Sequence, residues 1–147
     1  EWQCKIDEGL AGMLHCRWAP TGRHVLTVSD CKLRLTIWSL TDKSVQYIPS
    51  PKHEDKGIDF SPNNKLMAVI QKPTPDMIEA LGSQSDTIGI YETRSIGQWR
   101  CLFQFALNTA EVEDVKFSRD GNHLIVWESP GSCSVRIYNI VRGAGGI

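Results

Sequence analysis

A pattern that recurs three times along the chain constrains its fold more than any other feature. Each copy has an aromatic residue, a four-residue turn and then an apolar segment. The copies cover residues 16–26, 57–67 and 114–124, and their opening aromatic residues are Trp18, Phe60 and Phe117. A chain that repeats one small unit folds by stacking its copies, because no single unit can bury its apolar face alone.

The turns of the three copies share one chemistry. A type I turn favours Pro at its second position, and two of the copies have Pro20 and Pro62 there. The fourth position needs a left-handed backbone, which Gly and Asn adopt at low cost. This position holds Gly22, Asn64 and Gly121. The agreement predicts three hairpins of the same type.

Each copy closes with a segment that alternates between apolar and polar residues, which is typical of a half-buried strand. These segments end on the aromatic residues Trp38, Tyr91 and Tyr138. Further strands are predicted at 44–48 and 99–105, and residues 2–6 look like the same strand of a missing unit. The closing aromatic residues are 53 and 47 residues apart, close to the period of propeller blades.

We therefore predict an all-β chain of about three β-propeller blades, each with four antiparallel strands. Residues 1–6 form the outer strand of a preceding blade, 7–53 the first blade, 54–106 the second blade, 107–140 an incomplete third blade and 141–147 a tail. The second blade carries an insertion at 72–85, with a helix over 76–81 and Asp76 as its N-cap.

The blade count raises a problem of assembly, because propellers close with about 4–8 blades. The chain begins at Glu1 rather than Met, which predicts a piece of a longer protein. On paper, two copies would also give a ring of six blades. The N-terminal strand of each copy would then complete the last blade of the other.

Composition excludes several classes of function. Lys plus Arg number 16 and Asp plus Glu number 17, so the basic excess of a nucleic-acid binder is missing. No apolar run approaches the roughly 18–20 residues of a membrane span. Five cysteines at irregular spacing predict free thiols, mostly packed in strands, and a reducing compartment such as the cytoplasm. They are Cys4, Cys16, Cys31, Cys101 and Cys133.

We expect no catalytic, metal or cofactor site and no small-molecule substrate. His24 and His123 hold matching positions after the turn, which indicates a structural role in the repeat. The less favoured alternative is a metal cluster of His15, Cys16 and Cys31. The stretches around Ser83 and Ser132 do not fit the Gly-x-Ser-x-Gly motif of a serine hydrolase.

The blade pattern resembles the WD40 repeat family. The Trp-Asp position of that family corresponds to Trp38-Ser39, Tyr91-Glu92 and Tyr138-Asn139. Its turn Asp corresponds to Asp30 and Asp86, with Ser132 in the third copy. Its Gly-His pair is absent from all three copies, so the usual hydrogen-bonded tetrad cannot form and the blades should rest more on apolar packing.

A more specific likeness covers residues 1–48 and continues more weakly to Tyr138. It is carried by Glu1–Gly9, Thr21–His24, Leu33–Leu40 and Lys43–Val45, and by Ile125–Glu128 in the third copy. These residues resemble the centrosomal WD-repeat family that vertebrates encode antisense to a tumour-suppressor relative. The resemblance implies a scaffold at the centrosome or spindle pole body. Such a scaffold helps a coiled-coil partner to anchor microtubules, with roles in spindle assembly and cilium formation.

Acidic residues in the loops that lead into the blades are the candidate partner-binding residues. Three acidic loops on one face would form a rim for a basic partner, although solvated loops without a function are the simpler alternative. We expect the insertion on the same face, where its apolar residues would add an anchor. The candidates are Glu54, Asp55, Met77, Ile78, Leu81, Glu111 and Glu113, and Asp7-Glu8 is a further acidic pair.

The sequence thus favours a non-catalytic scaffold that binds proteins. Two alternatives remain open at this point. The first is a propeller of another complex, in translation initiation or trafficking. The second is the gating propeller of a prolyl-oligopeptidase-type hydrolase whose catalytic domain lies elsewhere.

Overall fold

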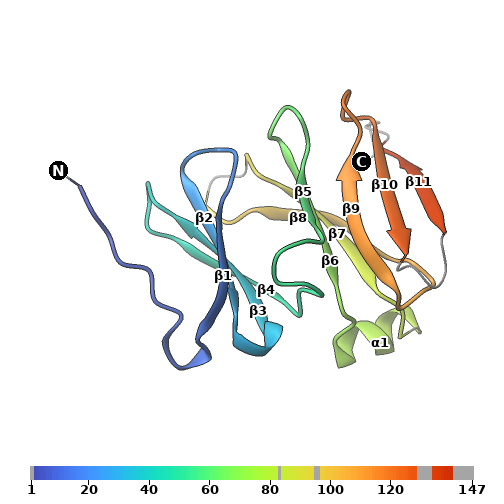
Figure 1. Ribbon diagram of the computed structural model, residues 1–147, viewed down its shortest axis with the longest axis horizontal. Coiled ribbons are helices and arrows are strands. Elements are labelled where there is room, and N and C mark those ends of the chain that lie inside the picture. Colours follow the sequence, from blue (N-terminus) through green and yellow to red (C-terminus); the bar gives the residue numbers. More distant parts are fainter. Residues whose placement is uncertain (1, 83, 95–96, 129–133, 141–147) are drawn as a thin grey trace.

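The computed structural model describes residues 2–82, 84–94, 97–128 and 134–140. Three antiparallel sheets stand side by side in chain order (Figure 1). The first contains β1 (Met13–Trp18), β2 (His24–Ser29), β3 (Arg34–Ser39) and β4 (Val45–Pro49). The second contains β5 (Ile58–Phe60), β6 (Leu66–Gln71), β7 (Thr87–Glu92) and β8 (Arg100–Ala106). The third contains β9 (Val112–Phe117), β10 (His123–Glu128) and β11 (Val135–Asn139).

This architecture confirms the predicted all-β partial propeller, in which each sheet is a blade. Short 3-10 turns at Gly9–Ala11 and Asp30–Lys32 and one helix complete the elements. The structure assigns no strand to residues 2–7, so an outer strand of a preceding blade at 1–6 stays a prediction. The exact blade boundaries also stay predictions, and the predicted tail at 141–147 lies outside the described residues.

The three hairpin turns have the predicted backbone. Gly22, Asn64 and Gly121 have φ angles of 72°, 60° and 76°. In each turn the amide of this residue donates to a carbonyl three residues earlier, at 3.0, 2.8 and 3.0 Å respectively. Left-handed φ values of this kind strain most other residues, which explains why the repeat keeps Gly or Asn there.

The helix in the insertion, α1 (Pro75–Leu81), begins one residue before the predicted start. The prediction of Asp76 as the N-cap was wrong, because Thr74 holds that position. Thr74 has an extended backbone, and its hydroxyl accepts a hydrogen bond from the Met77 amide at 3.3 Å. Pro75 then takes the first helical position, where its missing amide hydrogen costs nothing.

The core lies between the sheets rather than within any one of them. Between the first and second sheets, Leu26 and Ile37 pack in one cluster with Met67 and Val69. Between the second and third sheets, Ile90 packs in another cluster with residues of β10. All six residues of β6 are buried, so the middle sheet is covered on both faces.

Trp99 joins the first and second sheets and is only 2% exposed. Its ring lies 4.9 Å from that of His24 and 6.2 Å from that of Phe60, measured between centroids. The side chain of Gln46, on β4, binds both the amide and the carbonyl group of the Trp99 backbone. Gln46 Nε2 donates to the Trp99 carbonyl at 2.8 Å, and the Trp99 amide donates to Gln46 Oε1 at 2.6 Å.

The Trp99→Ala variant should lose about 3–5 kcal/mol of unfolding free energy, because it removes a buried aromatic ring and leaves a cavity. Urea denaturation followed by circular dichroism measures this change. The control is Leu33→Ala, because Leu33 is 63% exposed and its loss should cost less than about 1 kcal/mol. Equal losses in the two variants would contradict this role of Trp99.

Candidate interaction face

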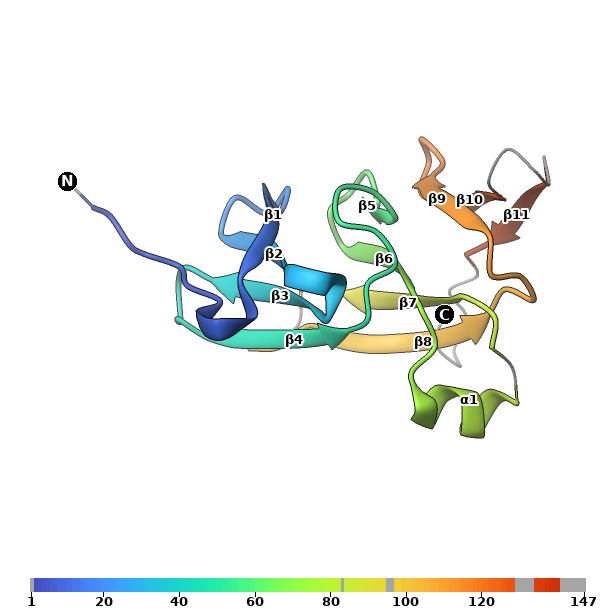
Figure 2. The same cartoon turned by 60° about the horizontal axis from the view of Figure 1, so that its bottom comes forward.

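The two loops that connect neighbouring sheets and the insertion within the second sheet meet on one side of the molecule, which we call the α1-side face. It comprises residues 50–57, 72–82, 84–86 and 107–111, and α1 projects from it (Figure 2). The chain pairs these loops directly. The Asp86 amide donates to the Thr109 carbonyl at 2.8 Å, and the Leu107 amide donates to the Asp86 carbonyl at 2.9 Å. The insertion therefore lies beside the loop that leads into the third sheet, as predicted.

A buried ion pair fixes these loops to one another. Lys52 Nζ binds the Asp86 carboxylate, and Asp86 is only 2% exposed. The same ammonium group donates to the Ala110 carbonyl at 2.8 Å. The Val112 amide donates to Asp86 Oδ2 at 3.2 Å. Removing either charge would leave the other buried without a partner, which is strongly destabilising.

A second ion pair lies closer to solvent, between Lys56 and Glu113. The ammonium group of Lys56 holds the pKa of Glu113 below its usual value, and Glu113 raises the pKa of Lys56 in return.

His53 Nε2 lies 3.1 Å from the Val112 carbonyl. Burial lowers the pKa of His53, against the opposing effect of that carbonyl, so His53 is neutral at physiological pH.

The predicted partner-binding residues divide into two groups. Glu54, Asp55 and Glu111 are exposed on the α1-side face, as an acidic rim requires. Glu113 is partly buried and already paired, so its charge is not available in the same way.

The structure supports the apolar part of the predicted site less well than its acidic part. Met77 and Ile78 are half-buried. The sulfur of Met77 accepts a hydrogen bond from the Thr74 amide at 3.4 Å, so Met77 helps to cap α1. The side chain of Leu81 lies outside the described part of the structure. The partner-binding role of these residues stays a prediction.

Glu8 is not part of an acidic rim, because it is 6% exposed and lies at the centre of a polar network in the first sheet. Trp38 Nε1 donates to Thr27 Oγ1 at 2.8 Å, and Thr27 Oγ1 donates to Glu8 Oε1 at 2.7 Å. Arg34 Nε and Nη2 both donate to Glu8 Oε2, at 2.9 and 2.7 Å. The Arg34 guanidinium also lies 4.4 Å from the centre of the Tyr47 ring.

The sequence analysis missed this network. We expected the loss of the Gly-His pair to leave mainly apolar packing, but Glu8 and Arg34 supply a different set of polar contacts in the first sheet. The register of the strands explains why this network is confined to the first sheet. The position of Thr27 is held by Val69 in β6 and Val126 in β10, and neither side chain can form hydrogen bonds. The signal in the sequence was the single Thr among these matching positions.

The turn aspartates and the cysteines also differ from expectation. Asp86 is buried, whereas Asp30 is exposed and accepts a hydrogen bond from the Cys31 amide at 2.9 Å. Ser132 lies outside the described residues. We expected the cysteines to pack mostly in strands, but Cys4, Cys16, Cys31 and Cys101 are exposed. Cys16 and Cys101 lie in β1 and β8, whereas Cys4 and Cys31 lie outside the strands. Cys133 lies outside the described residues.

Within the described ranges, no group of three or more His, Cys, Asp or Glu side chains could hold a metal ion. His24 has a structural setting, because its Nδ1 lies 2.9 Å from Thr21 Oγ1 and its ring packs on Trp99. No helix in the described part of the chain is long and apolar enough to span a membrane.

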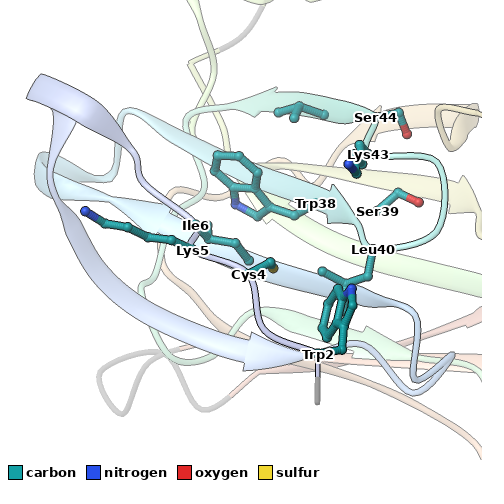
Figure 3. Close-up of a pocket in the computed structure, with 10 residues that line it drawn as sticks. Trp2, Cys4, Lys5, Ile6, Trp38, Ser39, Leu40, Lys43 and Ser44 are labelled. Atoms are coloured by element: carbon teal, nitrogen blue, oxygen red, sulfur yellow. The ribbon is translucent and has the colours of Figure 1, made fainter.

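The N-terminal residues lie along the open side of the first sheet. A groove of about 250 Å³ separates them from the end of β3 and the start of β4. Figure 3 shows Ile6 beside Trp38, and Trp2 beside Leu40. Trp2 remains 69% exposed, so the first sheet buries this N-terminal segment only in part.

Comparisons with known proteins agree with this architecture. The mouse WD repeat-containing protein WRAP73 is 31% identical over 140 residues, which is 95% of this chain and 28% of the mouse protein. A crystal structure of a candidate 6-phosphogluconolactonase from Bacteroides fragilis has a TM-score of 0.62 at 13% identity. It covers 97% of this chain and 38% of the bacterial chain. No family model matches the sequence.

The first similarity confirms the resemblance to WD-repeat proteins that the sequence predicts. The chain spans less than a third of the length of that mouse relative. At 13% identity, the second similarity shows the fold alone.

The Glu8→Gln variant should flatten the acid limb of the stability profile. Burial raises the pKa of Glu8, but the polar groups of Thr36, Thr27 and Arg34 lower it further, so the net pKa lies below its usual value. The native protein therefore gains stability from Glu8 above the unfolded-state pKa of about 4.3. It loses this contribution as the pH falls through the lower native pKa.

Urea denaturation between pH 3 and pH 7 measures this effect. At pH 7 the variant should be about 2 kcal/mol less stable than the native chain, and the difference should shrink towards pH 3. Glu111→Gln, at an exposed position, is the control and should leave the profile unchanged. A constant difference at every pH would contradict the role of the Glu8 charge.

Proposed function

We propose that this WD-repeat chain is part of a non-catalytic propeller scaffold that acts at the centrosome or spindle pole. Two observations support the proposal. The mouse relative is described as a WD repeat-containing protein and matches over 140 residues. The chain also resembles the centrosomal WD-repeat family in its N-terminal 48 residues. On this proposal the scaffold works in the cytoplasm, in microtubule anchoring, spindle assembly or cilium formation.

The α1-side face is the surface that we assign to the partner. Exposed carboxylates stand on two separate loops, at Glu54 and Asp55 and at Glu111. The exposed Asp76 and Glu79 of α1 add to the same charge. The Lys52–Asp86 pair fixes these loops to one another, so the rim does not have to be ordered on binding. A rigid surface with an excess of negative charge favours a positively charged partner and speeds its association.

The partner that fits this surface is a basic segment of a coiled-coil, microtubule-anchoring protein. A coiled coil displays rows of charged side chains along its outer positions. Lysine and arginine side chains in such a row can reach carboxylates on two loops at once. Binding of this kind weakens as salt rises, because exposed charges are screened within about 10 Å at 0.1 M salt.

The similarities favour a scaffold over an enzyme. The likeness to a WD-repeat protein is carried by 31% identity. The likeness to the candidate lactonase has 13% identity and extends to the fold. Function depends on sites placed on a fold rather than on the fold itself, so the second likeness carries no reaction to this chain.

Proximity labelling in dividing cells tests the proposal. The chain, fused to a biotin ligase, should enrich centrosomal and microtubule-anchoring proteins. The triple variant Glu54→Gln, Asp55→Asn, Glu111→Gln should reduce that enrichment by about tenfold, because it removes three exposed charges from the rim.

The control variant is Asp42→Asn with Asp120→Asn, because both residues lie at turns at the opposite ends of the strands. This control should keep the native enrichment. Enrichment of other classes of protein by the native chain would contradict the centrosomal role. Equal enrichment by the native chain and the triple variant would contradict the assignment of the partner to the α1-side face.

A further inference from the structure

Among the described residues, the third sheet has an open edge at β11. Within the described residues, β11 pairs with β10 alone, whereas the equivalent strands β3 and β7 each pair on both sides. The side chains of Val135 and Ile137 on β11 are 61% and 66% exposed. An edge strand of this kind presents unpaired backbone groups that can take up another strand.

A groove beside this edge corresponds to the site that Trp99 fills in the second sheet. The groove measures about 280 Å³ and is lined by Phe103, Phe105, Leu124, Tyr138, Asn139 and Ile140. Leu124 pairs with Tyr138 as Met67 pairs with Tyr91 in the second sheet.

The wall that the neighbouring sheet contributes to this groove also corresponds to a wall of the Trp99 site. Phe103 pairs with Ile90 on β7, as Gln46 pairs with Ile37 on β3. Gln46 is the residue that holds Trp99. The third sheet therefore offers a tryptophan site with an apolar wall where the second sheet has a polar clamp.

One segment of the chain has the composition that this site requires. Trp2-Gln3-Cys4 repeats the spacing of Trp99-Arg100-Cys101, which begins the fourth strand of the second sheet. Residues 2–7 form no strand in the structure, and Trp2 is 69% exposed. The tryptophan of this pattern is therefore buried at position 99 and largely exposed at position 2.

We propose that residues 2–6 of a second copy of this chain bind along β11 as its fourth strand, with Trp2 in the groove. The segment runs antiparallel to β11. Cys4 lies opposite Tyr138, as Cys101 lies opposite Tyr91 in the second sheet. This surface lies apart from the acidic rim of the α1-side face, and the proposal does not depend on the proposed function.

A second copy fits because the contact continues an interface that the chain already forms. In the first two sheets, an outer strand that carries Trp99 closes one blade against its neighbour. The open side of the first sheet exposes Met13 and Trp18, at 42% and 65%, and the open side of the third sheet exposes Ile125 and Ile137. These two apolar sides meet when two copies join head to tail.

Sedimentation velocity over a range of concentrations tests the proposal on the whole chain. The native chain should form a species of twice its mass of 16.5 kDa. The Trp2→Ala variant should associate at least about tenfold more weakly, because tryptophans in pockets dominate interfaces of this kind. A synthetic peptide of residues 2–8 should compete with association, and the same peptide with Ala in place of Trp2 should not.

The matched control is Leu33→Ala, because Leu33 is also largely exposed, at 63%, but lies between β2 and β3. This variant should associate like the native chain. A native chain that stays a monomer at all concentrations would overturn the proposal. Association that Trp2→Ala leaves unchanged would overturn it too, since the copies would then meet elsewhere.

Discussion

Burial of each sheet against its neighbour is the constraint on which the rest of this structure depends. A single four-stranded sheet has two faces and no helices to cover them, so its apolar side chains must find another sheet. The two clusters of buried residues lie at the two junctions between sheets. The middle sheet, covered on both sides, positions the others, and Trp99 closes the first junction through both packing and hydrogen bonds.

Polar contacts then fix what apolar packing leaves free. The first sheet has Glu8 and Arg34 at the point where the chain enters it. Lys52, on the loop between the first and second sheets, pairs with Asp86, which directly precedes β7 in the second sheet. Each pair holds a buried carboxylate, of Glu8 or Asp86, in place through several hydrogen bonds, so it fixes the arrangement of the chain around it. The α1-side face is consequently a preformed surface, as the proposed scaffold role requires.

Much of this fold could be predicted from the repeat. Turn positions such as Gly22 and Asn64 were predicted correctly because backbone strain limits them to few residues. The role of Glu8 could not be predicted, since its partner Arg34 is 26 residues away and only folding brings them together. The acidic residues of the loops were identified, but sequence cannot tell that Glu113 is paired with Lys56 while Glu111 is exposed.

Amide hydrogen exchange, read by mass spectrometry, tests most directly whether the sheets stabilise one another. The account predicts the slowest exchange in β6 and β7, because the middle sheet is covered on both faces. It predicts faster exchange in β11, because that strand lies at the edge of its sheet. It predicts the fastest exchange in residues 2–7, because they form no strand. If the middle sheet exchanged as fast as the first and third, each sheet would be stable on its own, and the central claim would be wrong.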